Sequence, residues 1–178
     1  MAIKIKKLLQ IGLLVEDLDR MVKFYEDNLG IGGWEISSST PPDMTINGVS
    51  YAESPVKIAI TKAFGMEFEL IQPLQPCPQK EWVDKHGSGL HHLAFETEEG
   101  YAEVRQFSEE VGGGTYVRGQ GMGGMMDYSY LDFSKQAGFY FECYKFIAPG
   151  RTGIPIDYPG ENASNVDPSK MPPRPAQN

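Results

Sequence analysis

The sequence predicts an α+β protein that consists of two tandem modules, each with the element order βαβββ. The first observation is an internal repeat: a strand, an amphipathic helix and a glycine stop occur early in the chain, and the same order recurs 82 residues later. The second observation is that several short strand-like segments follow each helix. The length of 178 residues suits two small modules that share one core.

The first module opens at a buried apolar strand, residues 8–15. Asp17 is the predicted N-cap of the helix that follows, and Gly30 is its predicted C-cap. Apolar residues of this helix recur at spacings of three, four, seven and eleven, which is typical of one buried helix face: Leu18, Met21, Val22, Tyr25 and Leu29. Further strands are predicted at residues 34–38, 49–52, 56–61 and 67–71.

The second module repeats this order. A strand is predicted at residues 91–96, Thr97 is the predicted N-cap of the next helix, and Gly112 ends that helix. A shift of 82 residues superposes Gln10 on His92. The apolar face of the second helix carries Tyr101, Val104, Phe107 and Val111, and strands are predicted at residues 115–118, 126–133 and 139–146.

The pattern divides the chain into four parts. Residues 1–75 form the first module and residues 90–147 the second. Residues 76–89 are read as a linker, because prolines break the pattern there. Seven of the 13 prolines fall in residues 147–178, so we expect residues 148–178 to be an extended tail that is draped on the surface or partly disordered.

Composition excludes several classes of partner. The chain has 16 basic and 24 acidic side chains, and its net charge of −8 would repel phosphate backbones and anionic lipid heads. No apolar run approaches the about 20 residues of a spanning helix, and no secretory signal follows the basic N-terminus. We therefore expect no nucleic-acid or membrane partner. The chain has two cysteines, Cys77 and Cys143, which are too few to stabilise a fold of this size by disulfide bonds. We therefore predict free thiols and a reducing cytoplasm.

Four polar residues occupy matching places in the two modules. Gln10 and His92 lie in the opening strands, and Glu69 and Glu142 lie in the closing strands, each glutamate between two apolar neighbours. Because strand side chains alternate between faces, both glutamates are expected on the face opposite their neighbours. A lone strand glutamate commonly faces solvent, and a lone histidine is commonly satisfied in the core. Two inward carboxylates instead need a partner, and a divalent cation would satisfy both.

Two further motifs have ordinary explanations. Residues 119–124 match GxGxxG literally but lack the strand-to-helix setting of a dinucleotide site, so we predict a hairpin loop there. Tyr128 and Tyr130 alternate along the next strand and place phenols on one face, where they either line a pocket or pack in the core.

Longer stretches resemble the vicinal oxygen chelate superfamily. Residues 10–19 (Gln-Ile-Gly-Leu-Leu-Val-Glu-Asp-Leu-Asp) and 24–30 (Phe-Tyr-Glu-Asp-Asn-Leu-Gly) resemble its first strand and helix. Residues 69–74 (Glu-Leu-Ile-Gln-Pro-Leu) and 85–95 (Lys-His-Gly-Ser-Gly-Leu-His-His-Leu-Ala-Phe) resemble its methylmalonyl-CoA epimerase branch. The resemblance covers residues 8–147, about four-fifths of the chain. It implies a U-shaped mixed sheet around a metal site, and a homodimer.

The resemblance also implies a ligand set: Gln10, Glu69, His92 and Glu142. Gln10 is a departure from the epimerase branch, which commonly has histidine there, and a Gln, Glu, His, Glu set resembles the eukaryotic-type zinc glyoxalase I. The mixed nitrogen and oxygen donors suit one divalent ion per chain, with zinc placed first and nickel, cobalt, manganese or iron as alternatives.

A second departure concerns the base. Lys57 aligns with the catalytic glutamate of the epimerases, so it is either a second acid or base or a solvated strand lysine. Glu53 is a nearby carboxylate of unassigned direction.

The resemblance implies a metal-dependent isomerase or lyase acting on a small molecule with vicinal oxygens. The ion would stabilise an enolate or enediolate while Glu142 or Glu69 takes a proton beside the carbonyl. Two alternatives stay open. One is an Fe(II)-dependent ring-cleaving dioxygenase, which Gln10 in place of a histidine disfavours. The other is a metal-free binding protein like the drug-sequestering members of the superfamily.

Overall fold

The computed structural model of the chain describes residues 2–40, 44–51, 54–121, 126–147 and 155–156. These residues form three helices and a single mixed sheet of 11 strands. The elements of the first half are β1 (Ile5–Leu14), α1 (Leu18–Leu29), β2 (Glu35–Ser39), β3 (Met44–Ile46), β4 (Val49–Tyr51), β5 (Val56–Ala63) and β6 (Met66–Pro73). Those that follow are α2 (Pro78–His86), β7 (Gly89–Thr97), α3 (Tyr101–Glu110), β8 (Thr115–Gly121), β9 (Met126–Phe133), β10 (Phe139–Ile147) and β11 (Pro155–Ile156).

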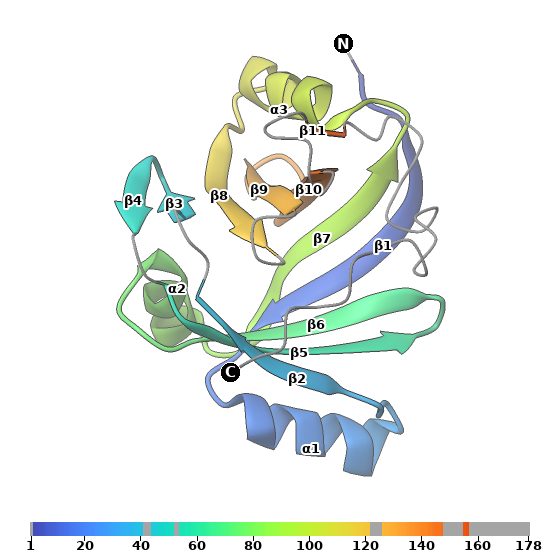
Figure 1. Cartoon of the computed structure of the whole chain (residues 1–178), viewed down its shortest axis with the longest axis vertical. Helices are drawn as coiled ribbons and strands as arrows, with labels where there is room; N and C mark the ends of the chain where they lie inside the picture. The colour runs from blue at the N-terminus through green and yellow to red at the C-terminus, as the bar shows by residue number, and fades with distance from the viewer. Residues whose placement is uncertain (1, 41–43, 52–53, 122–125, 148–154, 157–178) are drawn as a thin grey trace.

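The sheet has the strand order β2-β5-β6-β1-β7-β10-β9-β8-β3-β4, with β11 paired to β10. It curls so that β1 and β7 lie in its middle, while α1 and α3 lie against opposite ends of the molecule (Figure 1). β1 runs parallel to β6 and β7 runs parallel to β10, whereas β1 and β7 are antiparallel. The predicted α+β class with a curled mixed sheet is confirmed.

The two central strands show that the repeat is a structural one. In the β1–β7 pairing Gln10 lies opposite Ala94 and Gly12 lies opposite His92. The 82-residue shift that superposes Gln10 on His92 also superposes Gly12 on Ala94, so it maps one pair onto the other. The two halves are therefore related by a local twofold axis between β1 and β7.

The first helix begins and ends where the sequence predicts. The Asp17 carboxylate accepts a hydrogen bond from the backbone N–H of Arg20, and Gly30 ends α1 in the left-handed conformation with φ of 67°. Leu18 is fully buried against the sheet, where Ala59 and Leu70 meet the helix. Truncating such a core leucine to alanine costs about 2–5 kcal/mol of stability.

The second helix begins later than predicted. The N-cap of α3 is Gly100, whose backbone N–H donates to the Glu103 carboxylate over 2.8 Å. Thr97 instead ends β7, and its hydroxyl donates to the backbone oxygen of Glu99 over 2.7 Å. The prediction of Thr97 as the cap was wrong because this hydroxyl is used in the turn before the helix. α3 covers a core cluster that consists of Tyr101, Val104, Leu131, Phe133, Phe141 and Cys143.

The segment predicted as a linker contains a helix. α2 spans Pro78–His86, and its proline stands in the first turn, where a missing N–H leaves no hydrogen bond unmade. Val83 of this helix is buried in a cluster with Leu14, Val56 and Ile71. The predicted break at this proline is therefore the start of an element.

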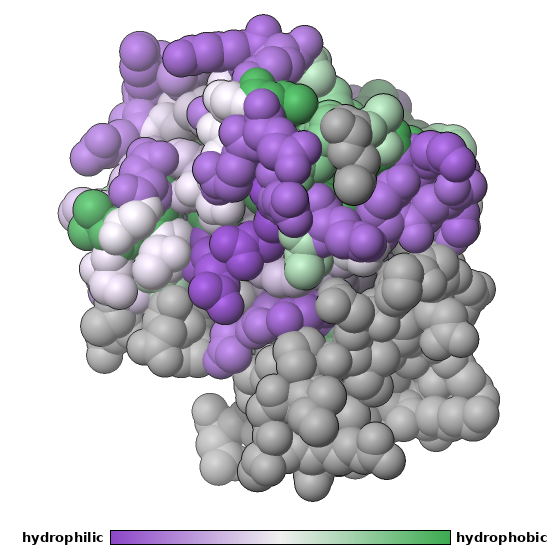
Figure 2. Space-filling view, turned by 90° about the horizontal axis from the view of Figure 1, so that it is seen from above, coloured by the Kyte–Doolittle hydropathy of each residue, from purple (hydrophilic) through white to green (hydrophobic). Residues whose placement is uncertain are grey.

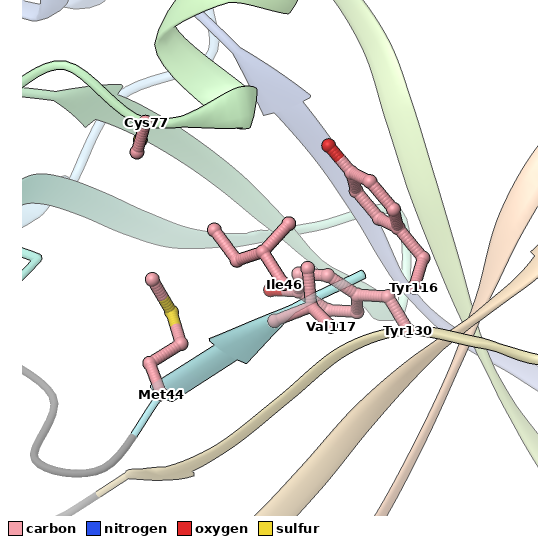
Figure 3. Packing of buried hydrophobic residues seen from close by; sticks show 6 residues of the cluster. All are labelled: Met44, Ile46, Cys77, Tyr116, Val117 and Tyr130. Carbon is pink, nitrogen blue, oxygen red and sulfur yellow. The ribbon is translucent and has the colours of Figure 1, made fainter. Parts of the chain in front are cut away.

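A short hairpin from the first half of the chain extends the sheet beside the last strands of the second half. β3 and β4 are joined by Asn47 and Gly48, both with positive φ, as a two-residue hairpin turn requires. β3 then pairs with β8, where Ile46 lies opposite Val117. The sequence predicted the strand at 49–52 but not β3. The resulting core cluster consists of Met44, Ile46, Cys77, Tyr116, Val117 and Tyr130 (Figure 3).

The described surface carries some exposed apolar side chains, among them Phe64, Val49 and Ile5. Most of the coloured surface in Figure 2 is hydrophilic, with apolar residues in smaller areas. None of the helices in the described ranges combines the length and the apolar character of a membrane span. Cys77 and Cys143 are buried free thiols, as predicted. Most of the predicted tail lies outside the described residues, apart from β11, which pairs with the end of β10.

Candidate functional site

The four predicted ligands meet at one atom. The Nε2 atom of His92, on β7, lies 3.2 Å from Oε1 of Gln10 on β1. The same nitrogen lies 3.3 Å from Oε2 of Glu69 on β6 and 3.5 Å from Oε2 of Glu142 on β10. Four neighbouring strands therefore bring together four side chains that are up to 132 positions apart in the printed sequence.

Strand register explains the convergence. Gly12 of β1 lies opposite Glu69 on one side and His92 on the other. Ala94 of β7 likewise lies opposite Gln10 and Glu142. Residues that lie directly opposite one another project from the same face of a sheet.

The parity that the sequence predicted for the two glutamates is confirmed. Leu70, next to Glu69, is fully buried in the cluster under α1. Phe141, next to Glu142, is buried in the cluster under α3. Both carboxylates therefore project from the face that is turned away from the two helices.

Gly12 makes room for the histidine. A Cβ atom at this position would lie 1.9 Å from Cε1 and 2.1 Å from Nε2 of His92, so the imidazole lies directly over the glycine backbone. Sequence reasoning missed Gly12 as a site residue. The available signal was a glycine inside an apolar strand, which often marks the close approach of another group.

Burial controls the charges of the site. His92 has no exposed surface and Glu142 is only 6% exposed. Burial alone would lower the pKa of His92, but its hydrogen bond to Glu69 and the charges of Glu142 and Glu69 raise that pKa above its ordinary value. Burial raises the pKa of the Glu142 carboxyl to about 8. Without a further cation the site therefore retains protons at neutral pH.

One buried oxygen lacks a donor. Oε2 of Glu142 is buried and has no hydrogen-bond partner among the described residues, since its 3.5 Å approach to His92 is an ion-pair contact only. A buried carboxylate oxygen without a donor is destabilising unless a cation approaches it. This oxygen therefore marks where positive charge is missing.

The donor set is one that could hold a divalent ion. Donors about 2.0–2.15 Å from a zinc ion are about 3.3–3.5 Å apart at tetrahedral angles. The separations of 3.2, 3.3 and 3.5 Å between Nε2 of His92 and the three oxygens are of this size. In the described part of the chain, no three His, Cys, Asp or Glu side chains are already arranged as a metal-binding group. The side chains of the site contact one another instead.

A family model describes this chain. The model of the Glyoxalase/Bleomycin resistance protein/Dioxygenase superfamily matches residues 9–120. The chain belongs to this superfamily. The resemblance to vicinal oxygen chelate proteins is thereby confirmed, and the match spans the first module and the opening of the second. A comparison with curated proteins found no significant match.

Several solved structures share this fold at low sequence identity. A hypothetical protein from Bacillus halodurans C-125 is 23% identical, with a TM-score of 0.53, covering 76% of this chain and 91% of that one. Methylmalonyl-CoA epimerase from Mycobacterium tuberculosis is 18% identical, with a TM-score of 0.54, covering 80% of this chain and 89% of that one. A methylmalonyl-CoA epimerase in complex with methylmalonyl-CoA and NH4+ is 18% identical, with a TM-score of 0.55. The match covers 79% of this chain and 94% of that one.

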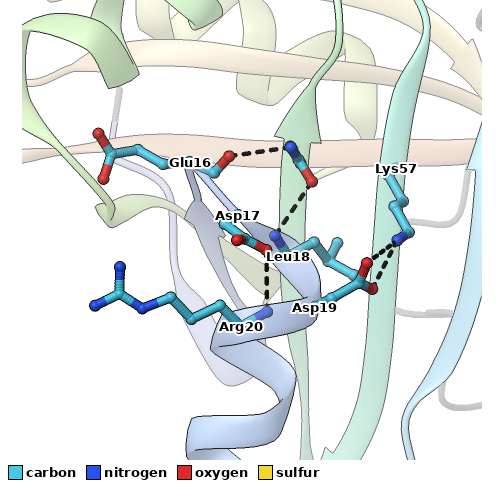
Figure 4. Close-up of polar contacts among 7 residues, drawn as sticks. Glu16, Asp17, Leu18, Asp19, Arg20 and Lys57 are labelled. Carbon is cyan, nitrogen blue, oxygen red and sulfur yellow. Dashed lines mark hydrogen bonds and ion pairs between the residues drawn. The ribbon is translucent and has the colours of Figure 1, made fainter.

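Lys57 lies apart from the other predicted site residues. Its Nζ lies 2.6 Å from both carboxylate oxygens of Asp19 at the start of α1 (Figure 4). Ala59, two residues further along β5, is buried under the same helix, so Lys57 lies on the helix-covered face of the sheet. Glu69 projects from the opposite face. Glu53, the other candidate carboxylate, lies outside the described residues.

Aromatic side chains cover the histidine. The Tyr130 ring stacks on that of His92 with centroids 4.4 Å apart, and the Tyr128 ring lies 5.5 Å from that of Tyr130. The Tyr128 hydroxyl donates to Sδ of Met44 over 3.4 Å. Burial raises the pKa of both tyrosines, so their phenols stay neutral. These rings form one wall beside the four donors.

The glycine-rich motif at residues 119–124 makes room for one ring of this aromatic wall. Its first three residues lie in β8, which pairs antiparallel with β9, so they belong to a strand and not to the predicted hairpin loop. A Cβ atom at Gly119 would lie 2.6 Å from the hydroxyl oxygen of Tyr128, so a glycine lets that ring lie across β8. Residues 122–124 of the motif lie outside the described residues.

Proposed function

We propose that this protein is a metal-dependent isomerase or lyase that removes a proton beside a carbonyl group. Its substrate would be a small molecule with two adjacent oxygens. The observation that supports this proposal most directly is the convergence of three oxygens on Nε2 of His92, one of them a buried carboxylate oxygen without a donor. One divalent ion per chain, zinc first among the candidates, would be held by Gln10, Glu69, His92 and Glu142.

The charges of the donors favour a dication. Gln10 and a neutral His92 carry no charge, so the two carboxylates supply the two negative charges that a divalent ion needs in a buried site. The bound ion would supply Lewis-acid stabilisation of the negative charge that develops on a substrate oxygen. The stacked Tyr130 ring excludes water from one side of the histidine.

Glu142 is the first choice for the base. Its carboxylate is buried beside Nε2 of His92. A bound dication would hold this carboxylate ionised, so it would act as a base once it leaves the ion. Glu69 is the second choice, because its carboxylate lies beside the same histidine. Lys57 is left out of the proton transfer, because its ammonium is held by Asp19 on the opposite face of the sheet.

Exchange of substrate hydrogen with solvent tests this proposal. The metal-loaded protein is incubated in deuterated water with 2-hydroxy acids, 2-keto acids and their thioesters, and deuterium beside the carbonyl is followed by NMR. We expect exchange in at least one class, and none with chelator-treated protein. Absence of exchange in every class would contradict the enzyme proposal, and oxygen uptake with catechols would support the dioxygenase alternative.

We also propose a symmetric homodimer. Among the described strands β2 and β4 end the sheet, and unpaired strand edges favour association. Light scattering at micromolar concentration should give twice the chain mass of 19.8 kDa, and a monomer mass would contradict the proposal.

A further inference from the structure

His91 lies beside the proposed ligand in an unusual way. Consecutive strand residues normally project from opposite faces, yet Nδ1 of His91 lies 3.1 Å from Nδ1 of His92. The pairing of β1 with β7 explains this. Leu13 lies opposite Leu90 and Gly12 lies opposite His92, so His91 is an extra residue in the ladder. Such a bulge redirects a side chain, and here it turns one imidazole toward the other.

The contact between the two Nδ1 atoms requires that one of them carries a proton and the other does not. In a hydrogen bond between two imidazole nitrogens one must donate and the other must accept. A histidine that binds a cation through Nε2 has its proton on Nδ1. Because Nε2 of His92 faces the oxygens of Gln10, Glu69 and Glu142, its Nδ1 must be the donor when that nitrogen binds an ion.

We propose that His91 is a positioning residue of this site: its Nδ1 accepts the proton of His92 Nδ1 and so directs the Nε2 lone pair of His92 toward the three oxygens. This inference rests on the proposed function. Ligating histidines commonly donate their second N–H to a carboxylate or a backbone carbonyl. A neutral imidazole as acceptor instead adds no negative charge, and the two carboxylates remain balanced by one dication.

The surroundings of His91 fit this role. The ring is only 1% exposed and is packed against aromatic rings, with centroids 4.8 Å away at Tyr140, 5.4 Å at Tyr130 and 5.9 Å at Trp82. Its Nε2 is buried and has no hydrogen-bond partner among the described residues. Packing alone would be served better by a phenylalanine, which leaves no donor unpaired. The one polar contact that His91 makes among the described side chains is the contact with His92.

Three variants and one spectrum test the role. His91→Phe keeps the ring but removes the acceptor, and His91→Asn keeps an oxygen near the place of Nδ1. Tyr140→Phe is the matched control, because it removes one phenol oxygen from the same aromatic surroundings and keeps the ring that contacts His91. Zinc and cobalt affinities are measured by chelator competition, and the histidine tautomers of the zinc-loaded wild-type protein are determined by nitrogen-15 NMR.

We expect His91→Phe to weaken zinc binding by about 10–100-fold, the usual effect of losing such a partner. His91→Asn should recover most of that loss, and Tyr140→Phe should bind like wild type. The spectrum should show His92 protonated at Nδ1 and His91 protonated at Nε2.

Wild-type zinc affinity in His91→Phe, or an unprotonated Nδ1 on His92, would overturn the inference. The spectrum decides the matter even if His91→Phe does not fold. If the wild-type protein binds no metal, the proposed function and this inference both fail. An unprotonated Nδ1 on His92 in the zinc-loaded protein would overturn the inference alone and leave the proposed function standing.

Discussion

The imidazole of His92 occupies the space over Gly12 that a Cβ atom would fill in any other residue. Such a Cβ atom would lie 1.9 Å from Cε1 of the ring, well inside van der Waals contact. Because Gly12 also lies opposite Glu69, this one backbone position fixes the distance between the histidine and a carboxylate of the neighbouring strand.

Gly12→Ala should therefore displace the ring and weaken metal binding by at least about tenfold, while overpacking lowers the free energy of unfolding by about 1–3 kcal/mol. Zinc titration and urea unfolding measure the two effects. The matched control is Gly32→Ala, since a Cβ there would lie 3.7 Å from the nearest side chain and should change neither quantity. Unchanged zinc affinity in Gly12→Ala would show that the ring is not held as described.

Glu142→Gln should separate metal binding from proton transfer. The amide oxygen can still bind an ion, as proposed for Gln10, but the amide cannot take a proton. We expect most of the metal to remain, with a loss of about 10²–10⁴-fold in the exchange rate, the range for a missing general base. Elemental analysis and the deuterium assay give the two values. Full activity with metal bound would move the base to Glu69.

Lys57→Ala should leave metal content and exchange unchanged. The variant loses the ion pair with Asp19, whose carboxylate is 69% exposed, so the free energy of unfolding should fall by only about 0–1 kcal/mol. Thermal unfolding and the deuterium assay test both statements. Loss of exchange at one face of the substrate carbon would instead make Lys57 a second acid or base.

Because the buried His91 has a lowered pKa and opposes the effect at lower pH, stability of the metal-free protein should fall as the pH rises from about 7 to 8. The pKa of Glu142 is raised from 4.5 to about 8 and that of His92 is raised above 6.5, so the native site holds more protons than the unfolded chain in this range. Stability falls with pH wherever the native state binds more protons. Urea unfolding with chelator present should show this slope, and Glu142→Gln should flatten it. Stability that rises with pH in this range would contradict the assigned charges.

The sequence predicted the donors because they follow the simplest rule of a strand. Glu69 and Glu142 each lie between apolar residues, and alternation alone assigns them to one face. The 82-residue repeat then paired Gln10 with His92, and the structure has these two side chains in contact.

Other features depend on pairings that no local pattern contains. β3 has three residues, and Arg118, which lies opposite its Thr45, is far along the chain. Pro78 predicted a break, although a proline also suits the first turn of a helix. The role of His91 follows from a bulge that appears only when β7 is paired with β1.

Metal content is the decisive measurement for the proposed site. Protein purified without chelator, and protein reloaded separately with zinc, nickel, cobalt or manganese, is analysed for its elements alongside His92→Ala. We predict about one divalent ion per chain in the wild-type protein and little in His92→Ala, because Nε2 of His92 is the atom on which the three oxygens converge. A wild-type content near zero that none of the four metals restores would contradict a metal site at His92.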